Sequence, residues 1–126
     1  MSKKSISVRV HVSLEDLESI LYGAYEGTGY WAKDKRDKED YQVGIALLCY
    51  EDSMKDFIAG DLQIYIHDTE DNDKQYILTI AKIKRGLTCM AKKFPKHFAD
   101  IMTENTDIYT ADVLVQCALF NDIIYS

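Results

Sequence analysis

Apolar and polar residues alternate over residues 5–12, which is the period of a strand with one buried face. Its apolar side carries Ile6, Val8, Val10 and Val12. Over residues 14–24 the apolar positions recur every three or four residues, which predicts an amphipathic helix. Ser13 and Asp16 form the start of this helix, where the hydroxyl accepts from a free backbone N–H. Gly27 ends it.

Strand patterns return in the middle of the chain. Residues 41–49 and 62–67 each predict a strand, and the polar run 68–74 turns the chain so that residues 75–78 return as a hairpin partner. The calcium-loop reading of the acidic turn fails. Asp73 stands where that loop needs glycine, and Thr79 stands where it needs glutamate.

Helical patterns dominate the second half. Ser53 predicts the cap of a short helix over residues 53–58 that stops at Gly60, and Thr79 predicts the cap of a longer helix over residues 80–94. Pro95 suits the first turn of a following helix, since its missing N–H is not needed there. Thr110 predicts the start of a last helix over residues 111–120.

These elements predict an α+β fold, with a small antiparallel sheet of about four strands, three to five helices and a helical C-terminal half. The chain has 126 residues, the size of one ordinary domain, and no linker divides it. We therefore expect a single domain over residues 1–126.

The last helix is apolar nearly all round, so most of its sides must be covered. Either the sheet and the neighbouring helices cover it, or another subunit does. The second alternative predicts a homo-oligomer that pairs through residues 111–120.

Charge and cysteine content limit the binding partners and the cellular compartment that we expect. Asp and Glu (21) outnumber Lys and Arg (15), for a net charge of −6, which disfavours binding to nucleic acid or to an anionic membrane. The three cysteines are far apart and no pair is spaced for zinc, so we expect buried thiols in a reducing compartment. No apolar run is long enough to span a membrane. We expect a cytoplasmic protein without a metal or another cofactor.

An aromatic turn is the first candidate binding element. Tyr22, Tyr25, Tyr30 and Trp31 surround the glycines of residues 27–29, and aromatic faces beside glycine suit stacking on a ring or docking a partner. In the alternative reading, Tyr25 and Trp31 close the edge of the core while Tyr22 and Tyr30 lie over the surface.

The second candidate is a basic face on the helix over residues 80–94. Lys82, Arg85, Lys92 and Lys93 lie opposite the apolar stripe of this helix, with Lys96 just beyond. Several cations together can hold a phosphate, and the guanidinium of Arg85 can pair with two of its oxygens. An ordinary solvated helix face is the alternative.

Catalytic motifs are lacking. No nucleophile elbow, phosphate-binding loop or metalloprotease motif is present, and the three histidines have no motif partner. We therefore expect a non-enzymatic protein. An enzyme acting on nucleotides or phosphoesters through His11 or His97 stays as an alternative.

Three blocks of the chain carry a resemblance to a known family. The blocks are residues 10–16 with Glu26-Gly27 and Tyr30-Trp31, residues 78–83 with Arg85-Gly86-Leu87, and residues 97–100 through Ala111-Asp112-Val113 to residues 118–125. They resemble a family of small uncharacterised accessory proteins of tailed bacteriophages and prophages. The resemblance covers both halves of the chain and leaves residues 33–58 unmatched.

The resemblance implies a phage protein that antagonises host defence by binding, acting in the host cytoplasm. The favoured version sequesters a small nucleotide-type immune signal. The rings of this signal molecule would stack on Tyr25, Tyr30 or Trp31. Its phosphates would be held by Lys82, Arg85 and Lys92. The alternative is a protein–protein inhibitor of a host defence complex, similar to anti-CRISPR proteins, with the Tyr/Trp surface as its hot spot.

Overall fold

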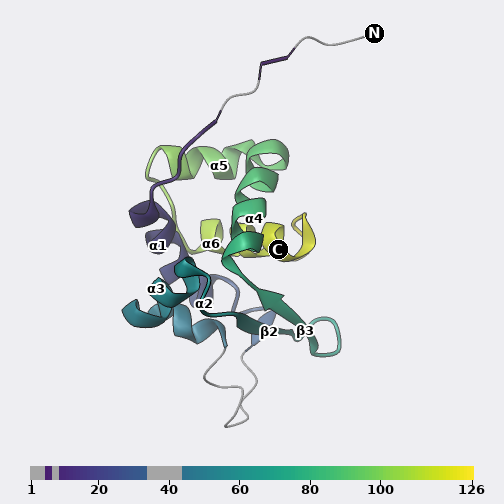
Figure 1. Ribbon diagram of the computed structural model, residues 1–126. Helices are drawn as coiled ribbons and strands as arrows, with labels where there is room; N and C mark the ends of the chain where they lie inside the picture. The colour runs from purple at the N-terminus through teal and green to yellow at the C-terminus, as the bar shows by residue number, and fades with distance from the viewer. Residues whose placement is uncertain (1–4, 7–8, 34–43) are drawn as a thin grey trace.

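The computed structural model describes residues 5–6, 9–33 and 44–126. Figure 1 shows a β-hairpin at one end of the molecule, α5 at the other and α6 between them. The elements in chain order are α1 (Leu14–Tyr22), α2 (Ala24–Gly27), β1 (Ala32–Lys33), a 3-10 helix (Ile45–Cys49), α3 (Glu51–Ala59), β2 (Ile64–Asp68), β3 (Lys74–Leu78), α4 (Ile80–Lys93), α5 (Pro95–Met102) and α6 (Ile108–Phe120). The predicted α+β class and the helical C-terminal half are confirmed.

The sheet is smaller than predicted. Its order is β1-β2-β3, with both pairs antiparallel, and β1 adds only two residues to the edge of the β2–β3 hairpin. Asn72 and Asp73 at the hairpin tip have φ of 54° and 57°, the left-handed conformation that tight hairpin turns require. About four strands and three to five helices were expected. The described residues form three strands, six α-helices and one 3-10 helix.

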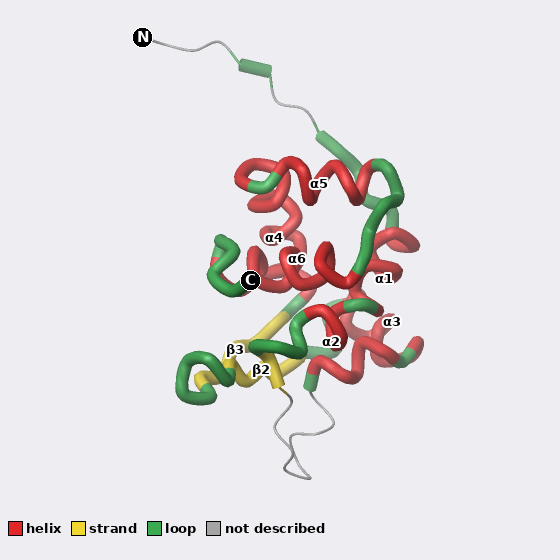
Figure 2. The backbone as a smooth tube through the Cα atoms, turned by 180° about the vertical axis from the view of Figure 1, so that it is seen from behind, coloured by secondary structure: helices red, strands yellow, loops and turns green. Residues whose placement is uncertain are grey.

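The strand predicted over residues 5–12 is wrong for its described part. Residues 5–6 and 9–12 belong to no strand, and Ile6 and Val10 are 90% and 53% exposed. Residues 7–8 lie outside the described residues. A strand needs a neighbour, and the described residues of this segment pair with neither of the sheet's edge strands, β1 and β3. Figures 1 and 2 show the described part of this segment, residues 5–6 and 9–12, leading away from the body.

The second missing strand, predicted over residues 41–49, is a 3-10 helix from Ile45 to Cys49, while residues 41–43 lie outside the described part. Its buried residues Ile45 and Leu48 are three positions apart, which is one 3-10 turn. A short apolar run does not separate these two conformations. The next helix, α3, begins at Glu51 rather than at Ser53, and Gly60 ends it with φ of 87°.

The capping residues predicted the helix starts better than the alternating patterns predicted the strands. The Ser13 hydroxyl accepts from the Asp16 N–H at 3.0 Å, and the Thr79 hydroxyl accepts from the Lys82 N–H at 3.2 Å. Pro95 opens α5 as predicted. For α6, Thr110 is part of the cap but does not begin the helix: Asp107 is the N-cap, and it exchanges hydrogen bonds with Thr110 in a capping box.

Helix α6 is the centre of the core. Every residue from Thr110 to Ala118 is buried, and the helix contacts α1, α2, α4, α5 and β3. The chain's own elements therefore cover the helix. The prediction that residues 111–120 form the interface of a homo-oligomer is wrong. Figure 2 shows α6 surrounded by the other elements. Among the described residues, no helix has the length and apolar content needed to cross a bilayer.

Candidate protein-docking face

The aromatic turn is bound to α6 through one buried carboxylate. Trp31 is wholly buried, and its indole N–H donates to Asp112 Oδ1 at 2.7 Å. The Tyr30 hydroxyl donates to Asp112 Oδ2 at 2.5 Å, and the Gln116 amide donates to Asp112 Oδ1 at 3.0 Å. Three donors thus satisfy a carboxylate that is 5% exposed.

A second group of contacts covers the Trp31 ring. The ring of Tyr125 stacks on Trp31, with centroids 5.4 Å apart and planes 26° apart, and Phe120 tilts against the same indole at 5.5 Å. The Tyr125 hydroxyl donates to Oδ2 of the buried Asp68 at 2.6 Å. Trp31 therefore lies between α6 and the residues that follow it.

The role predicted for Trp31 as a solvent-facing stacking platform is corrected by this burial. The alternative reading, in which Trp31 belongs to the core and Tyr30 lies over the surface, fits the structure. Tyr25 was expected beside Trp31 at the core edge, but it is 50% exposed. Burial is favourable for an indole whose N–H donates to a buried carboxylate, because the apolar ring leaves water and the donor still has an acceptor.

Burial and hydrogen bonding raise the pKa of two tyrosine hydroxyls. Burial, together with the Asp112 carboxylate, raises the pKa of Tyr30, and the hydrogen bond to Asp68, followed by burial, raises the pKa of Tyr125. Both phenols therefore remain protonated donors beyond the ordinary tyrosine range. Neither is poised as a base near neutral pH.

The basic face of α4 is partly exposed. Arg85 and Lys92 are exposed and seven residues apart, so they share one side of the helix. Lys82 is half-buried, and its ammonium donates to the backbone carbonyl of Ile77 at the open edge of β3. Lys82 thus stabilises the hairpin rather than standing free beside Arg85.

The aromatic turn and the basic face lie on opposite sides of α6. Asp112 and Gln116 face the turn, whereas Gly86 of α4 packs against the α6 backbone at Leu114 and Ala118. At about 100° per residue, the two pairs of α6 positions lie on nearly opposite sides. The rings and the cations predicted to form one ligand site are therefore not brought together.

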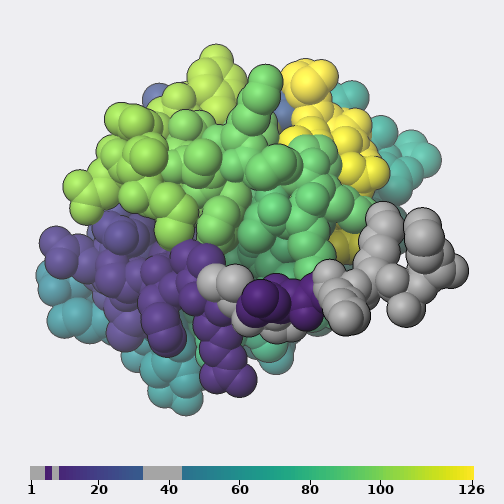
Figure 3. Space-filling view, turned by 90° about the horizontal axis from the view of Figure 1, so that it is seen from above, coloured from purple at the N-terminus to yellow at the C-terminus, as the bar shows by residue number. Residues whose placement is uncertain are grey.

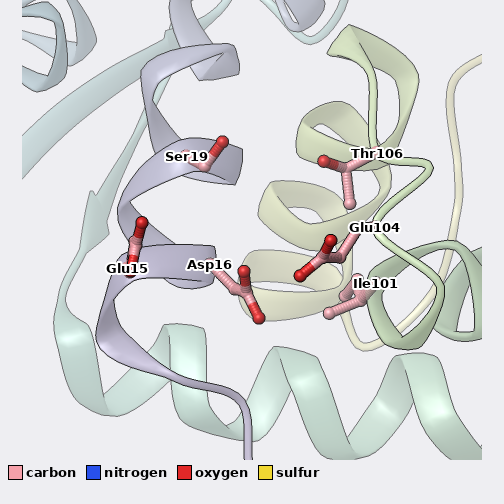
Figure 4. A pocket seen from close by; sticks show the side chains of 6 residues that line it. All are labelled: Glu15, Asp16, Ser19, Ile101, Glu104 and Thr106. Carbon is pink, nitrogen blue, oxygen red and sulfur yellow. The ribbon is translucent and has the colours of Figure 1, made fainter.

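An acidic hollow lies between α1 and the loop after α5. It has a volume of about 300 Å³, and Figure 4 shows the Asp16 and Glu104 side chains extending toward each other across it. The buried Ile101 lies at its wall. The lining residues are Glu15, Asp16, Ser19, Ile101, Glu104 and Thr106. Sequence reasoning missed this hollow because its two acidic sides are 88 residues apart along the chain, between Asp16 and Glu104.

Exposed tyrosines continue this surface. Glu15, Ser19 and Tyr22 are spaced four and three residues apart and share one stripe of α1, so the hollow leads along the helix toward Tyr22. Tyr109 follows Thr106 by three residues on the other side. The exposed fractions are 39% for Tyr22, 50% for Tyr25, 45% for Tyr30 and 68% for Tyr109. We call the hollow together with Tyr22, Tyr25 and Tyr109 the docking face, whereas Tyr30 lies beside Gln116, which holds the C-terminal residues.

The elements of the docking face come together because two glycines lie against α6. A Cβ on Gly27 would lie 2.1 Å from the Ile108 carbonyl, so only glycine lets α2 approach the first turn of α6 this closely. Gly23 lies beside the same turn, with Ile108 and Ala111 at ordinary contact distance. Tyr25 of α2 and Tyr109 of α6 are thereby carried on adjoining elements.

The docking face has one sign of charge. Neither residues 10–32 nor residues 97–126 contain Lys or Arg. The lysines and arginine of the second half lie instead on β3, α4 and the start of α5. Among the described residues no cluster of His, Cys, Asp and Glu is placed to hold a metal ion, so the hollow's carboxylates do not form a ligand set.

No family model, curated protein or solved structure matches this chain.

Proposed function

We propose that this chain is a non-enzymatic phage accessory protein that antagonises host defence by binding a defence protein through the docking face. The observation that carries this proposal is the joining of exposed tyrosines to an acidic hollow within two stretches, residues 10–32 and 97–126, that contain no Lys or Arg. Tyrosines are frequent anchors of protein interfaces, since each buries a large ring and keeps a polar tip.

The charge of the face specifies the partner's chemistry. A surface of carboxylates is complementary to lysine and arginine side chains, and defence effectors that hold nucleic acid expose such side chains. The hollow accommodates a long basic side chain between Asp16 and Glu104, and the tyrosines pack around it. A phosphate-bearing ligand is repelled by the same carboxylates.

Co-purification from a host that carries its defence system tests the proposal. The tagged full chain should retain an identified defence protein, and Tyr25→Ala with Tyr109→Ala should lose it while remaining folded. Tyr50→Ala is the matched control, because Tyr50 is 63% exposed and lies just before α3, on neither of the two stretches that carry the docking face. Equal retention by all three proteins would contradict the assignment of the face.

Sequestration of a small nucleotide-type signal is the second candidate. The observation in its favour is the pair Arg85 and Lys92, exposed on one side of α4 in a chain of net charge −6. Calorimetric titration with cyclic dinucleotides and ADP-ribose derivatives tests it, and Arg85→Ala with Lys92→Ala should abolish any binding. A flat titration would remove this candidate and leave the docking face untouched.

A further inference from the structure

The residues after α6 fold back onto it and are held by a small set of buried groups. Gln116 Oε1 accepts from the backbone N–H groups of Ile124 and Tyr125, both at 2.8 Å. Gln116 Nε2 donates to the Tyr125 carbonyl at 3.1 Å. With the ring face of Trp31 and the carboxylate of Asp68, Gln116 forms what we call the tail clamp.

The tail clamp recognises an extended peptide with a tyrosine. One amide side chain contacts three backbone groups of the peptide, an indole stacks on the phenol ring, and a buried carboxylate accepts its hydroxyl. Trp31, Asp68 and Gln116 are all wholly buried, whereas Ile124 is 51% exposed. The receiving groups thus belong to the core, and the segment they hold lies on the surface.

Asn121 directs the segment into its own clamp. It has φ of 56°, the left-handed region, and it caps α6 with its N–H on the Cys117 carbonyl at 3.1 Å. Lys93 donates to the Asn121 carbonyl at 2.7 Å. If Asn121 adopted the right-handed conformation, α6 would continue and the following residues would point away from Gln116.

We propose that residues 121–126 exchange between two copies of this chain, so that Tyr125 of each copy fills the tail clamp of the other. Asn121 is the hinge, and the exchange gives a closed dimer in which both copies use the same contacts. This inference is independent of the docking face. Figure 3 shows α1 and the C-terminal residues at opposite sides of the molecule.

The segment that fills the tail clamp is present in every copy of this chain. The clamp matches the sequence Ile124-Tyr125 in its backbone, ring and hydroxyl contacts, and another copy presents that sequence unchanged. Helix α6 is covered within its own chain and supplies no interface. Opening the segment also breaks no strand pairing and no helix, since residues 121–126 belong to neither.

Concentration and the hinge determine the balance between closed monomer and exchanged dimer. A short segment has an effective concentration of the order of millimolar at its own site, so we expect the wild-type dimer at about 1 mM protein. Alanine disfavours the left-handed conformation relative to asparagine or glycine, so Asn121→Ala should strengthen dimerisation by about tenfold. Asn121→Gly should weaken it.

Light scattering on the full chain, refolded at each concentration, tests the proposal. The expected result is a dimer of Asn121→Ala at about 0.1 mM, where the wild type and Asn121→Gly are monomers. Adding Tyr125→Ala to Asn121→Ala should restore the monomer. A synthetic peptide, Asn-Asp-Ile-Ile-Tyr-Ser, should dissociate the dimer, whereas the same peptide with alanine for tyrosine should not.

Three results would overturn the exchange. The first is a monomeric mass for Asn121→Ala at about 1 mM. The second is a dimer that survives Tyr125→Ala, which would mean that the interface lies elsewhere. The third is a dimer that both peptides leave intact.

Discussion

A single residue, Asp112, decides where the aromatic turn lies. It accepts hydrogen bonds from Trp31, Tyr30 and Gln116 inside the core. Asp112→Ala leaves the buried indole N–H of Trp31 without its acceptor and takes one acceptor each from Tyr30 and Gln116, and an unmet buried donor costs about 1–3 kcal/mol. We expect a loss of about 3 kcal/mol in the free energy of unfolding, measured by urea denaturation.

Asp112→Asn is the matched control for that measurement. Its amide oxygen still accepts from Trp31, and its NH2 group donates to the Tyr30 hydroxyl if that hydroxyl turns to accept. It should therefore lose less stability than Asp112→Ala. Equal losses in the two variants would mean that the packing of the side chain, and not its hydrogen bonds, matters.

The raised pKa of Tyr30 gives stability a dependence on alkaline pH. Its pKa is higher in the folded protein than in the unfolded chain, where it is about 10, so the contribution is complete below pH 10 and is lost as pH rises through the folded value. The stability of the wild type should therefore fall more steeply above pH 10 than that of Tyr30→Phe. Urea denaturation from pH 8 to 11 measures this, and parallel curves would contradict it.

The burial of Trp31 could not be predicted from the residues next to it in the chain. Trp31 and Asp112 are 81 residues apart, and nothing near Trp31 in the chain distinguishes a core indole from an exposed one. The available clue was in α6: Asp112 and Gln116 are polar residues one turn apart in an otherwise apolar helix. A carboxylate and an amide in such a helix require buried donors, and an indole N–H supplies one.

At the scale of elements, the approach of α2 to α6 depends on Gly27. A Cβ there would lie 2.1 Å from the Ile108 carbonyl, and a backbone atom of the facing helix cannot turn aside as a side chain does. Gly27→Ala should therefore cost about 3 kcal/mol, at the upper end of overpacking losses, and should shift Tyr25 relative to Tyr109. Thermal unfolding and partner binding measure the two effects.

Gly23→Ala is the control for that change. Its Cβ would meet the Ile20 carbonyl at 3.4 Å, and the backbone there has φ of −83°, which suits any residue. We expect a change of less than about 1 kcal/mol. A loss as large as that of Gly27→Ala would mean that flexibility, and not the close approach, governs this contact.

Elements with a local stop or start signal were predictable, and those that depend on a distant partner were not. Thr79 and Pro95 fix the starts of α4 and α5 through their own backbone geometry. The alternation in residues 5–12 describes a strand only if another strand pairs with it, and no described residue of this segment joins the sheet. The acidic hollow forms where α1 meets the loop after α5, so neither stretch of sequence predicts it alone.

At the scale of the whole molecule, charge is divided between two sides of one buried helix. The docking face carries carboxylates without a basic residue, while Arg85 and Lys92 lie on α4. This division explains how a chain of net charge −6 presents surfaces of both signs.

The central position of α6 sets the order in which the fold opens. Exposing its amides requires separation from α1, α2, α4, α5 and β3 together, whereas α3 has its main contacts with the 3-10 helix and α4. Amide hydrogen exchange should therefore be slowest over residues 112–118, at the rate of global unfolding, and faster in α3 through local opening. Mass spectrometry of deuterated peptides measures both. Equal protection from exchange in α3 and α6 would mean that the whole fold opens as one unit, and that α6 is no more stable than the other helices.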